Sequence, residues 1–160
     1  MTDAKAIDAQ CGVEKGMTSL AAGLAGGNLV YESSGMMASL LGASFEAFLL
    51  DNEMHSANFR ILRGIEVNDE TLDLETIENA IIGEGPFLGE DQTIAAMERD
   101  YVYPDMANRD PPITWAEKGH ADIWQTANRR VKEILADYHP QYLAPEADLQ
   151  IRDRFRIFLS

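Results

Sequence analysis

Sulfur and imidazole side chains are scarce in this 160-residue chain, which has one cysteine, Cys11, and three histidines. A lone cysteine excludes an internal disulfide and a multi-cysteine zinc site. Because the histidines are scattered over positions 55, 120 and 139, no metal site is expected. A nucleophilic thiol is only a remote option, since Cys11 has no histidine near it in sequence.

Long apolar runs are also missing. Residues 1–10 contain no apolar signal-peptide core, so we expect a cytoplasmic protein. The longest apolar stretches, residues 20–30 and 36–50, are too short or too interrupted to cross a bilayer. No association with a membrane is therefore expected.

Positive charge is in short supply, with 13 lysines and arginines against 27 acidic residues and a net charge of -14. Such an acidic surface repels phosphate backbones and anionic lipid, so binding of nucleic acid or of a membrane surface is not expected. An acidic field can favour cationic substrates. Its more ordinary role is solubility, and we favour that interpretation.

Strand signals are the remaining scarcity. Residues 13–25 read as a helix that Gly26 and Gly27 terminate, and Asn28–Tyr31 follows as a short apolar strand with a polar loop, residues 32–35, after it. This order is one αβ step of a parallel α/β sheet. A single strand cannot satisfy its own backbone hydrogen bonds, so its partner strands are expected to come from another polypeptide or an N-terminal part.

Helix signals fill the rest of the chain. We predict a helix from the N-cap Ser44 to Arg63, ended by Gly64, with an apolar face of residues 45, 48, 49, 52, 59 and 62. Thr114 and Glu117 form a capping-box pattern that predicts the longest helix, to Tyr138. Further helices are predicted over residues 73–82, 92–99 and 148–159, the last with positions 151, 155 and 158 inward. The chain has room for one domain but is too short for a complete eight-stranded barrel.

Short motifs spread over nearly the whole sequence, in order and spacing, carry a family resemblance. They are Asp8-Ala9-Gln10, Glu14-Lys15, Ala25-Gly26-Gly27-Asn28-Leu29-Val30-Tyr31, Gly35, Ser44-Phe45-Glu46, Asp51, Glu53, Gly64-Ile65-Glu66-Val67, Glu70-Thr71-Leu72, Phe87-Leu88-Gly89, Thr93, Asp110, Trp115 and Gly119. Together they resemble the C-terminal third of the trimethylamine methyltransferase family. The resemblance implies an α/β fold: the C-terminal part of a TIM (β/α)8 barrel of the methylamine methyltransferase type, with this chain mostly helical and holding one or two strands.

The resemblance also implies a reaction, the transfer of a methyl group from a methylated tertiary or quaternary amine to cobalamin. The cobalamin is carried by a partner corrinoid protein, so this chain is expected to bind no cofactor directly. Some members use pyrrolysine; this chain has none, and members without it resemble demethylases of quaternary amines such as glycine betaine. The amine stays open, and the isolated chain is predicted to be inactive.

Candidate substrate-binding residues follow from the strand and the resemblance together. In a parallel barrel the site lies at the carboxyl ends of the strands. Tyr31 offers an aromatic face to a quaternary cation, Glu32 offers a counter-charge, and Ser33 is a weaker polar candidate. The plain alternative is that Tyr31 packs under a helix and Glu32 caps a loop. A different function for the whole chain is a non-catalytic helical module for docking or assembly, left after loss of the N-terminal barrel.

Overall fold

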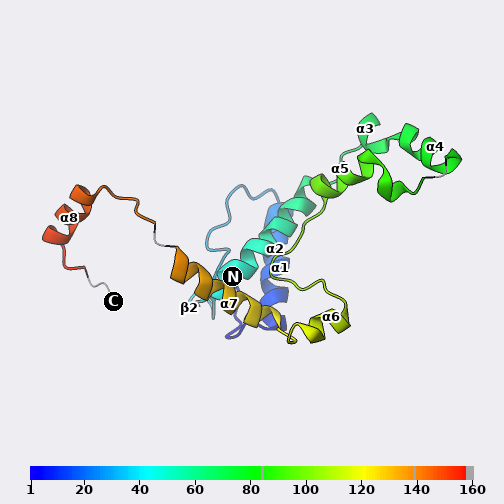
Figure 1. Ribbon diagram of the computed structural model, residues 1–160. Helices are drawn as coiled ribbons and strands as arrows, with labels where there is room; N and C mark the ends of the chain where they lie inside the picture. The colour runs from blue at the N-terminus through cyan, green and yellow to red at the C-terminus, as the bar shows by residue number, and fades with distance from the viewer. Residues whose placement is uncertain (84, 139, 158–160) are drawn as a thin grey trace.

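The computed structural model describes residues 1–83, 85–138 and 140–157. Within these ranges the chain forms eight α-helices, one 3-10 helix and one small β-hairpin (Figure 1). In chain order they are α1 (Ala9–Leu24), β1 (Met36–Met37), β2 (Gly42–Ala43), α2 (Phe45–Arg63), α3 (Asp69–Leu72), α4 (Leu74–Ile82), η1 (Phe87–Gly89), α5 (Asp91–Asp100), α6 (Pro112–Glu117), α7 (Ile123–Asp137) and α8 (Pro145–Arg154). The mostly helical character is as predicted.

The molecule is elongated, with α1, α2 and α7 packed together at its centre (Figure 1). Helices α3, α4 and α5 extend to one end, and α8 stands at the other end of an extended connection. Helix α2 is the axis of the centre because it packs against both α1 and α7. Asn58 on α2 donates to the Ser19 hydroxyl on α1 at 2.9 Å, and Asn128 on α7 donates to Glu46 on α2 at 2.7 Å.

Local capping chemistry determines where the central helices begin and end. The Asp8 side chain accepts from the Cys11 amide, so α1 begins earlier than the predicted Val13. Ser44 caps α2 and Gly64 ends it at a φ of 73°, which confirms both predicted boundaries. The predicted helices over residues 73–82 and 92–99 are confirmed as α4 and α5.

The predicted strand Asn28–Tyr31 is wrong. These residues form an irregular connection between α1 and β1, and the structure shows no backbone hydrogen bond from them to any described residue. A β-rich sequence needs a neighbouring strand and a surface to pack on, and neither is present beside this segment. The strands form instead at Met36–Met37 and Gly42–Ala43, which pair antiparallel with Met36 opposite Ala43.

The predicted helix from Thr114 to Tyr138 is two helices. Helix α6 ends at Glu117, and Gly119 and His120 then take positive φ angles of 96° and 59°. A reciprocal capping box between Asp122 and Gln125 starts α7. This second box, after a glycine that permits the turn, prevails over the Thr114 pattern.

The last predicted helix is also displaced. Helix α8 starts at Pro145, a residue suited to the first helical turn, and ends at Arg154. Ile151 and Phe155, predicted to face inward, are 36% and 64% exposed. Phe158 lies outside the described residues.

The buried core is small. Among the described residues the buried apolar side chains are Ala4, Cys11, Met37, Ala47, Ala127 and Val131. Much of the apolar face predicted for α2 is uncovered, with Phe45 63% and Phe59 70% exposed. The accessible surface is 12504 Å², against about 7,900 Å² for a compact monomer of this mass. The chain thus leaves much of its apolar surface uncovered.

Candidate functional site

The predicted substrate residues lie together in the connection between α1 and β1. Tyr31 is 80% exposed, while Glu32 and Ser33 are half-buried. Glu32 has a φ of 52°, so the chain turns sharply just after Tyr31. The alternative in which Tyr31 packs under a helix is wrong, because its ring is exposed. The three residues are consecutive in this connection, with Tyr31 the most exposed of them.

A buried ion pair anchors the far end of this connection. The Lys15 ammonium on α1 lies 2.5 Å from Asp51 Oδ2 on α2, and their side chains are 2% and 5% exposed. The same Asp51 oxygen accepts from the Gly35 backbone amide at 2.7 Å. Gly35 is itself buried, with a φ of 74°. Asp51 therefore links α1, α2 and the connection that carries Tyr31.

Gly35 is a site where no side chain fits. A Cβ built there would meet the Phe48 ring at 2.2 Å, and its positive φ also disfavours other residues. The close approach of backbone to ring is what brings the Gly35 amide to Asp51. The motifs that carry the family resemblance include both Gly35 and Asp51, but nothing in the sequence paired Asp51 with Lys15.

A cavity of about 660 Å³ opens beside this ion pair. Its walls come from α1, α2, the connection after α5 and the first turn of α7. Apolar groups and a few charged ones line it together, a mixture typical of small-molecule pockets. The residues that define it are Ile7, Cys11, Lys15, Leu50, Asp51, Glu53, Met54, Val102, Arg109, Ile123 and Trp124.

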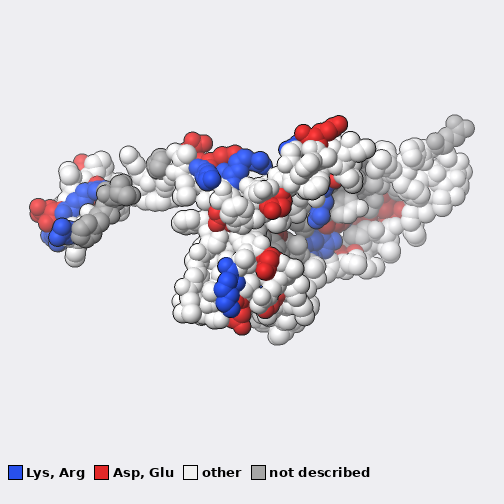
Figure 2. Space-filling view, turned by 90° about the horizontal axis from the view of Figure 1, so that it is seen from below, with Lys and Arg blue, Asp and Glu red and all other residues white. Residues whose placement is uncertain are grey.

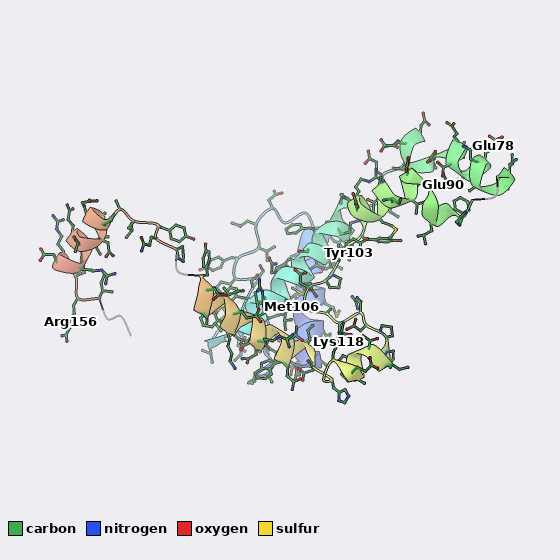
Figure 3. All side chains as sticks on the ribbon, in the orientation of Figure 1. Glu78, Glu90, Tyr103, Met106, Lys118 and Arg156 are labelled. Carbon is green, nitrogen blue, oxygen red and sulfur yellow. The ribbon has the colours of Figure 1, made fainter. Side chains whose placement is uncertain are left out.

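Glu53 holds one wall of the cavity in place. Its carboxylate accepts from the backbone amides of Asp105, Met106 and Ala107 at 2.6, 2.6 and 3.0 Å. Met106 and Tyr103 lie on this connection beside the central helices (Figure 3). Three amides that converge on one carboxylate fix the connection to α2 through charge-assisted bonds. Because its oxygens already accept these three hydrogen bonds, we assign the Glu53 carboxylate a structural role and not ligand binding.

Cys11 lies in the same cavity wall but is a poor nucleophile. It is 5% exposed, and burial raises the pKa of its thiol above the ordinary value, although Lys15 nearby acts in the opposite direction. A raised thiol pKa leaves little thiolate at neutral pH. In the described part of the chain, no three His, Cys, Asp or Glu side chains are grouped to hold a metal.

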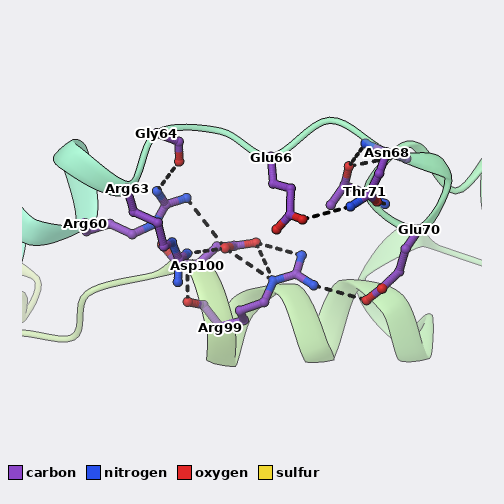
Figure 4. A network of polar contacts seen from close by, with 9 residues as sticks. All are labelled: Arg60, Arg63, Gly64, Glu66, Asn68, Glu70, Thr71, Arg99 and Asp100. Atoms are coloured by element: carbon purple, nitrogen blue, oxygen red, sulfur yellow. Dashed lines mark hydrogen bonds and ion pairs between the residues drawn. The ribbon is translucent and has the colours of Figure 1, made fainter.

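A second polar cluster lies at the outer end of α2, where α5 returns (Figure 4). Asp100 pairs with Arg63 at 2.5 Å and with Arg99 at 3.0 Å, and Arg60 lies 3.6 Å away. The hydrogen bond from Arg99 lowers the pKa of the Asp100 carboxyl. The Arg60 Nε also donates to the Asp100 carbonyl at 2.6 Å. These bonds fasten α5 to α2, and we assign the cluster a structural role.

Charged side chains gather in small separate clusters, with broad uncharged surface between them (Figure 2). Over the described ranges, no helix combines the length and the apolar composition needed to cross a bilayer.

Comparison with known proteins gives one consistent answer. A protein-family model described as trimethylamine methyltransferase (MTTB) matches residues 1–156. Glycine betaine methyltransferase of Desulfitobacterium hafniense (strain Y51) is 32% identical over 152 residues, which are 95% of this chain and 31% of that protein. Trimethylamine methyltransferase MttB of Methanosarcina barkeri is 35% identical over 138 residues, 86% of this chain and 27% of that protein. The chain therefore spans less than a third of the length of these relatives.

Proposed function

Because the chain belongs to the trimethylamine methyltransferase family, we propose that it is a working part of a methyltransferase that demethylates a tertiary or quaternary amine. The observation that carries this proposal is the family match over residues 1–156. The methyl acceptor is proposed to be a cobalamin held by a partner corrinoid protein, and cobalt supplies the nucleophile. The complete fold is proposed to be a (β/α)8 barrel, to which this chain contributes helices at the C-terminal side.

The proposed task of this chain's own residues is to hold the cation. A quaternary ammonium has no N–H group, so aromatic faces and carboxylates bind it. Tyr31, Glu32 and Ser33 are the residues that we assign to this task. Tyr31 supplies the ring face and Glu32 the counter-charge, while the Asp51 anchor at Gly35 keeps the connection in position.

The exposure of Tyr31 supports this assignment. Tyr31 points away from the chain's own core, so its ring is available to a ligand or to a companion surface. An exposed cation–π contact stabilises binding by about 0.5–1 kcal/mol, and a desolvated one by about 2 kcal/mol or more. The proposal therefore requires the rest of the enzyme to exclude water around Tyr31.

The test uses a single-chain chimera in which this chain replaces the matching 31% of glycine betaine methyltransferase from D. hafniense. We expect the chimera to methylate cob(I)alamin with glycine betaine or trimethylamine. Tyr31→Ala should weaken binding of the accepted amine roughly tenfold or more in calorimetry, and Tyr31→Phe should cost much less. Glu32→Gln should weaken binding of the cationic amine and leave binding of a neutral isostere unchanged. A folded chimera with no methyl transfer from any methylated amine would contradict the proposal.

One observation favours a second candidate function. The small core and the large uncovered surface also suit a non-catalytic helical module for docking or assembly. Such a module would bind a companion without contributing to the cation site. In the chimera it would preserve folding while Tyr31→Ala and Glu32→Gln left amine affinity unchanged.

A further inference from the structure

The cavity of about 660 Å³ beside the Lys15–Asp51 pair has no part in the proposed cation site. Tyr31, Glu32 and Ser33 are described by the structure and do not line it. Its volume lies within the range of about 300–1,000 Å³ that small-molecule sites occupy. Its walls come from the start of α1, from α2, from the connection after α5 and from the start of α7. The cavity is therefore formed by the packed centre of the chain and has room for a ligand of its own.

Six charged side chains line this cavity, and three of them are already occupied by other groups of the chain. The six are Asp8, Lys15, Asp51, Glu53, Arg109 and Asp122. Lys15 and Asp51 neutralise each other in the buried ion pair. The Glu53 carboxylate accepts three backbone amides. Two carboxylates and one guanidinium are left.

The three remaining charged groups have unused bonding capacity. Asp8 and Asp122 each use one carboxylate oxygen to cap a helix, at 3.1 Å from the Cys11 amide and 2.7 Å from the Gln125 amide. Their second oxygens accept no hydrogen bond from any described residue. Arg109 makes neither a hydrogen bond nor an ion pair within the described ranges. Charges of both signs thus line one cavity without pairing with each other.

This arrangement suits a ligand that carries both charges on an apolar body. The planar guanidinium of Arg109 matches a carboxylate through two parallel hydrogen bonds. The free oxygens of Asp8 and Asp122 attract an ammonium group, and the indole of Trp124 offers the ring face that binds cations best. The apolar walls are formed by Ile7, Leu50, Met54, Val102 and Ile123.

Ligands with a single charge fit the same walls less well. A simple anion would meet Arg109 but also two free carboxylates, in a chain whose net charge is -14. A simple cation would leave the Arg109 guanidinium without a partner.

We propose that this cavity binds a zwitterionic amino acid with an apolar side chain, whose amino group is either free or N-methylated. The carboxylate pairs with Arg109, and the ammonium lies near Asp8, Asp122 and Trp124. The site is separate from the one assigned to Tyr31, Glu32 and Ser33.

The experiment is calorimetric titration of the 160-residue chain with four probes that share one apolar body and differ in charge. They are L-phenylalanine, N,N,N-trimethylphenylalanine, 3-phenylpropionate and phenethylamine. We expect at least one zwitterion to bind roughly tenfold or more tightly than either singly charged analogue. Tighter binding of the trimethylated form assigns the cation contact to the Trp124 face, and tighter binding of the free amino acid assigns it to N–H donation to the carboxylates.

Two sets of variants test the two ends of the ligand separately. Arg109→Gln should weaken the zwitterion and 3-phenylpropionate roughly tenfold and leave phenethylamine unchanged. Arg129→Gln is the matched control, because it removes the same charge from an exposed arginine that does not line the cavity. Asp8→Asn combined with Asp122→Asn keeps both caps, since asparagine caps helices as well as aspartate does. It should weaken the zwitterion and phenethylamine roughly fivefold or more and spare 3-phenylpropionate.

Three outcomes would each overturn the inference. They are no saturable binding of any probe, equal binding of the zwitterions and a singly charged analogue, and equal effects of Arg109→Gln and Arg129→Gln. The comparison of the four probes on the parent chain needs no variant, so it remains decisive even if Arg109→Gln fails to fold. Because no methyl transfer is measured, the result is independent of the proposed function.

Discussion

Removing the positive half of the buried Lys15–Asp51 pair should cost more than removing both charges. In Lys15→Met, the Asp51 carboxylate stays buried with the Gly35 amide as its remaining donor. Breaking one side of a buried ion pair typically costs about 3–5 kcal/mol, because the other charge is left uncompensated. Whole domains are stable by about 5–15 kcal/mol, and the small core here suggests the lower part of that range.

The double variant Lys15→Met with Asp51→Asn removes both charges and keeps an amide oxygen for the Gly35 N–H. Its expected loss is no more than about 1–2 kcal/mol, since a neutral pair of similar shape replaces the ion pair. If each single variant loses about 3–5 kcal/mol, the two losses should not add, and the coupling between them should be about 4 kcal/mol or more.

The assay is urea unfolding followed by circular dichroism, for the parent chain, both single variants and the double variant. If Lys15→Met fails to fold, recovery of the helical signal in the double variant carries the same information. Additive losses, or a double variant that is less stable than either single one, would refute the view that Asp51 is buried and dependent on Lys15.

Three further predictions concern other contacts of the same centre. Hydrogen bonds from Ser44 and Asn128 lower the pKa of the Glu46 carboxyl. The stabilisation from Glu46 is therefore fully present above the ordinary carboxyl pKa and is lost as the pH falls through the lowered pKa. The melting temperature should thus fall less steeply on acidification in Glu46→Gln than in the parent chain. Cys11 should resist a thiol reagent at pH 8 in the native chain and react in urea, and fast native labelling would contradict its burial. Gly35→Ala should destabilise the chain by more than the roughly 1–2 kcal/mol expected for Gly64→Ala. Both glycines have positive φ, but only at position 35 would the added Cβ also clash with the Phe48 ring. Equal losses of stability in urea unfolding would contradict this.

Predictions from short-range sequence signals were correct where the chain itself contains all the partners. Ser44 and Gly64 bound α2 as expected, since a cap needs only the neighbouring turn. The same local chemistry explains the error at Thr114. Two capping boxes lay eight residues apart, and only the turn at Gly119 decides that Asp122 starts the longer helix.

Predictions that depend on partners distant in the sequence were less successful. Asn28–Tyr31 has the composition of a strand, but a strand requires a neighbour to pair with. The aromatic face of α2 is regular in sequence and exposed in the structure, because periodicity shows which residues share a face and not what covers it. Lys15 and Asp51 lie 36 positions apart on two different helices, so no periodicity within one helix predicts that they pair.

The contribution of this chain to a methyltransferase is tested most directly by comparing two versions of glycine betaine methyltransferase from D. hafniense. One lacks the segment that matches this chain, and the other carries this chain in its place. The measurement is the rate of cob(I)alamin methylation with glycine betaine and with trimethylamine. We predict no turnover in the deleted enzyme and restored turnover in the chimera with at least one of the two amines. Equal turnover in both versions, or none in a folded chimera, would contradict the account.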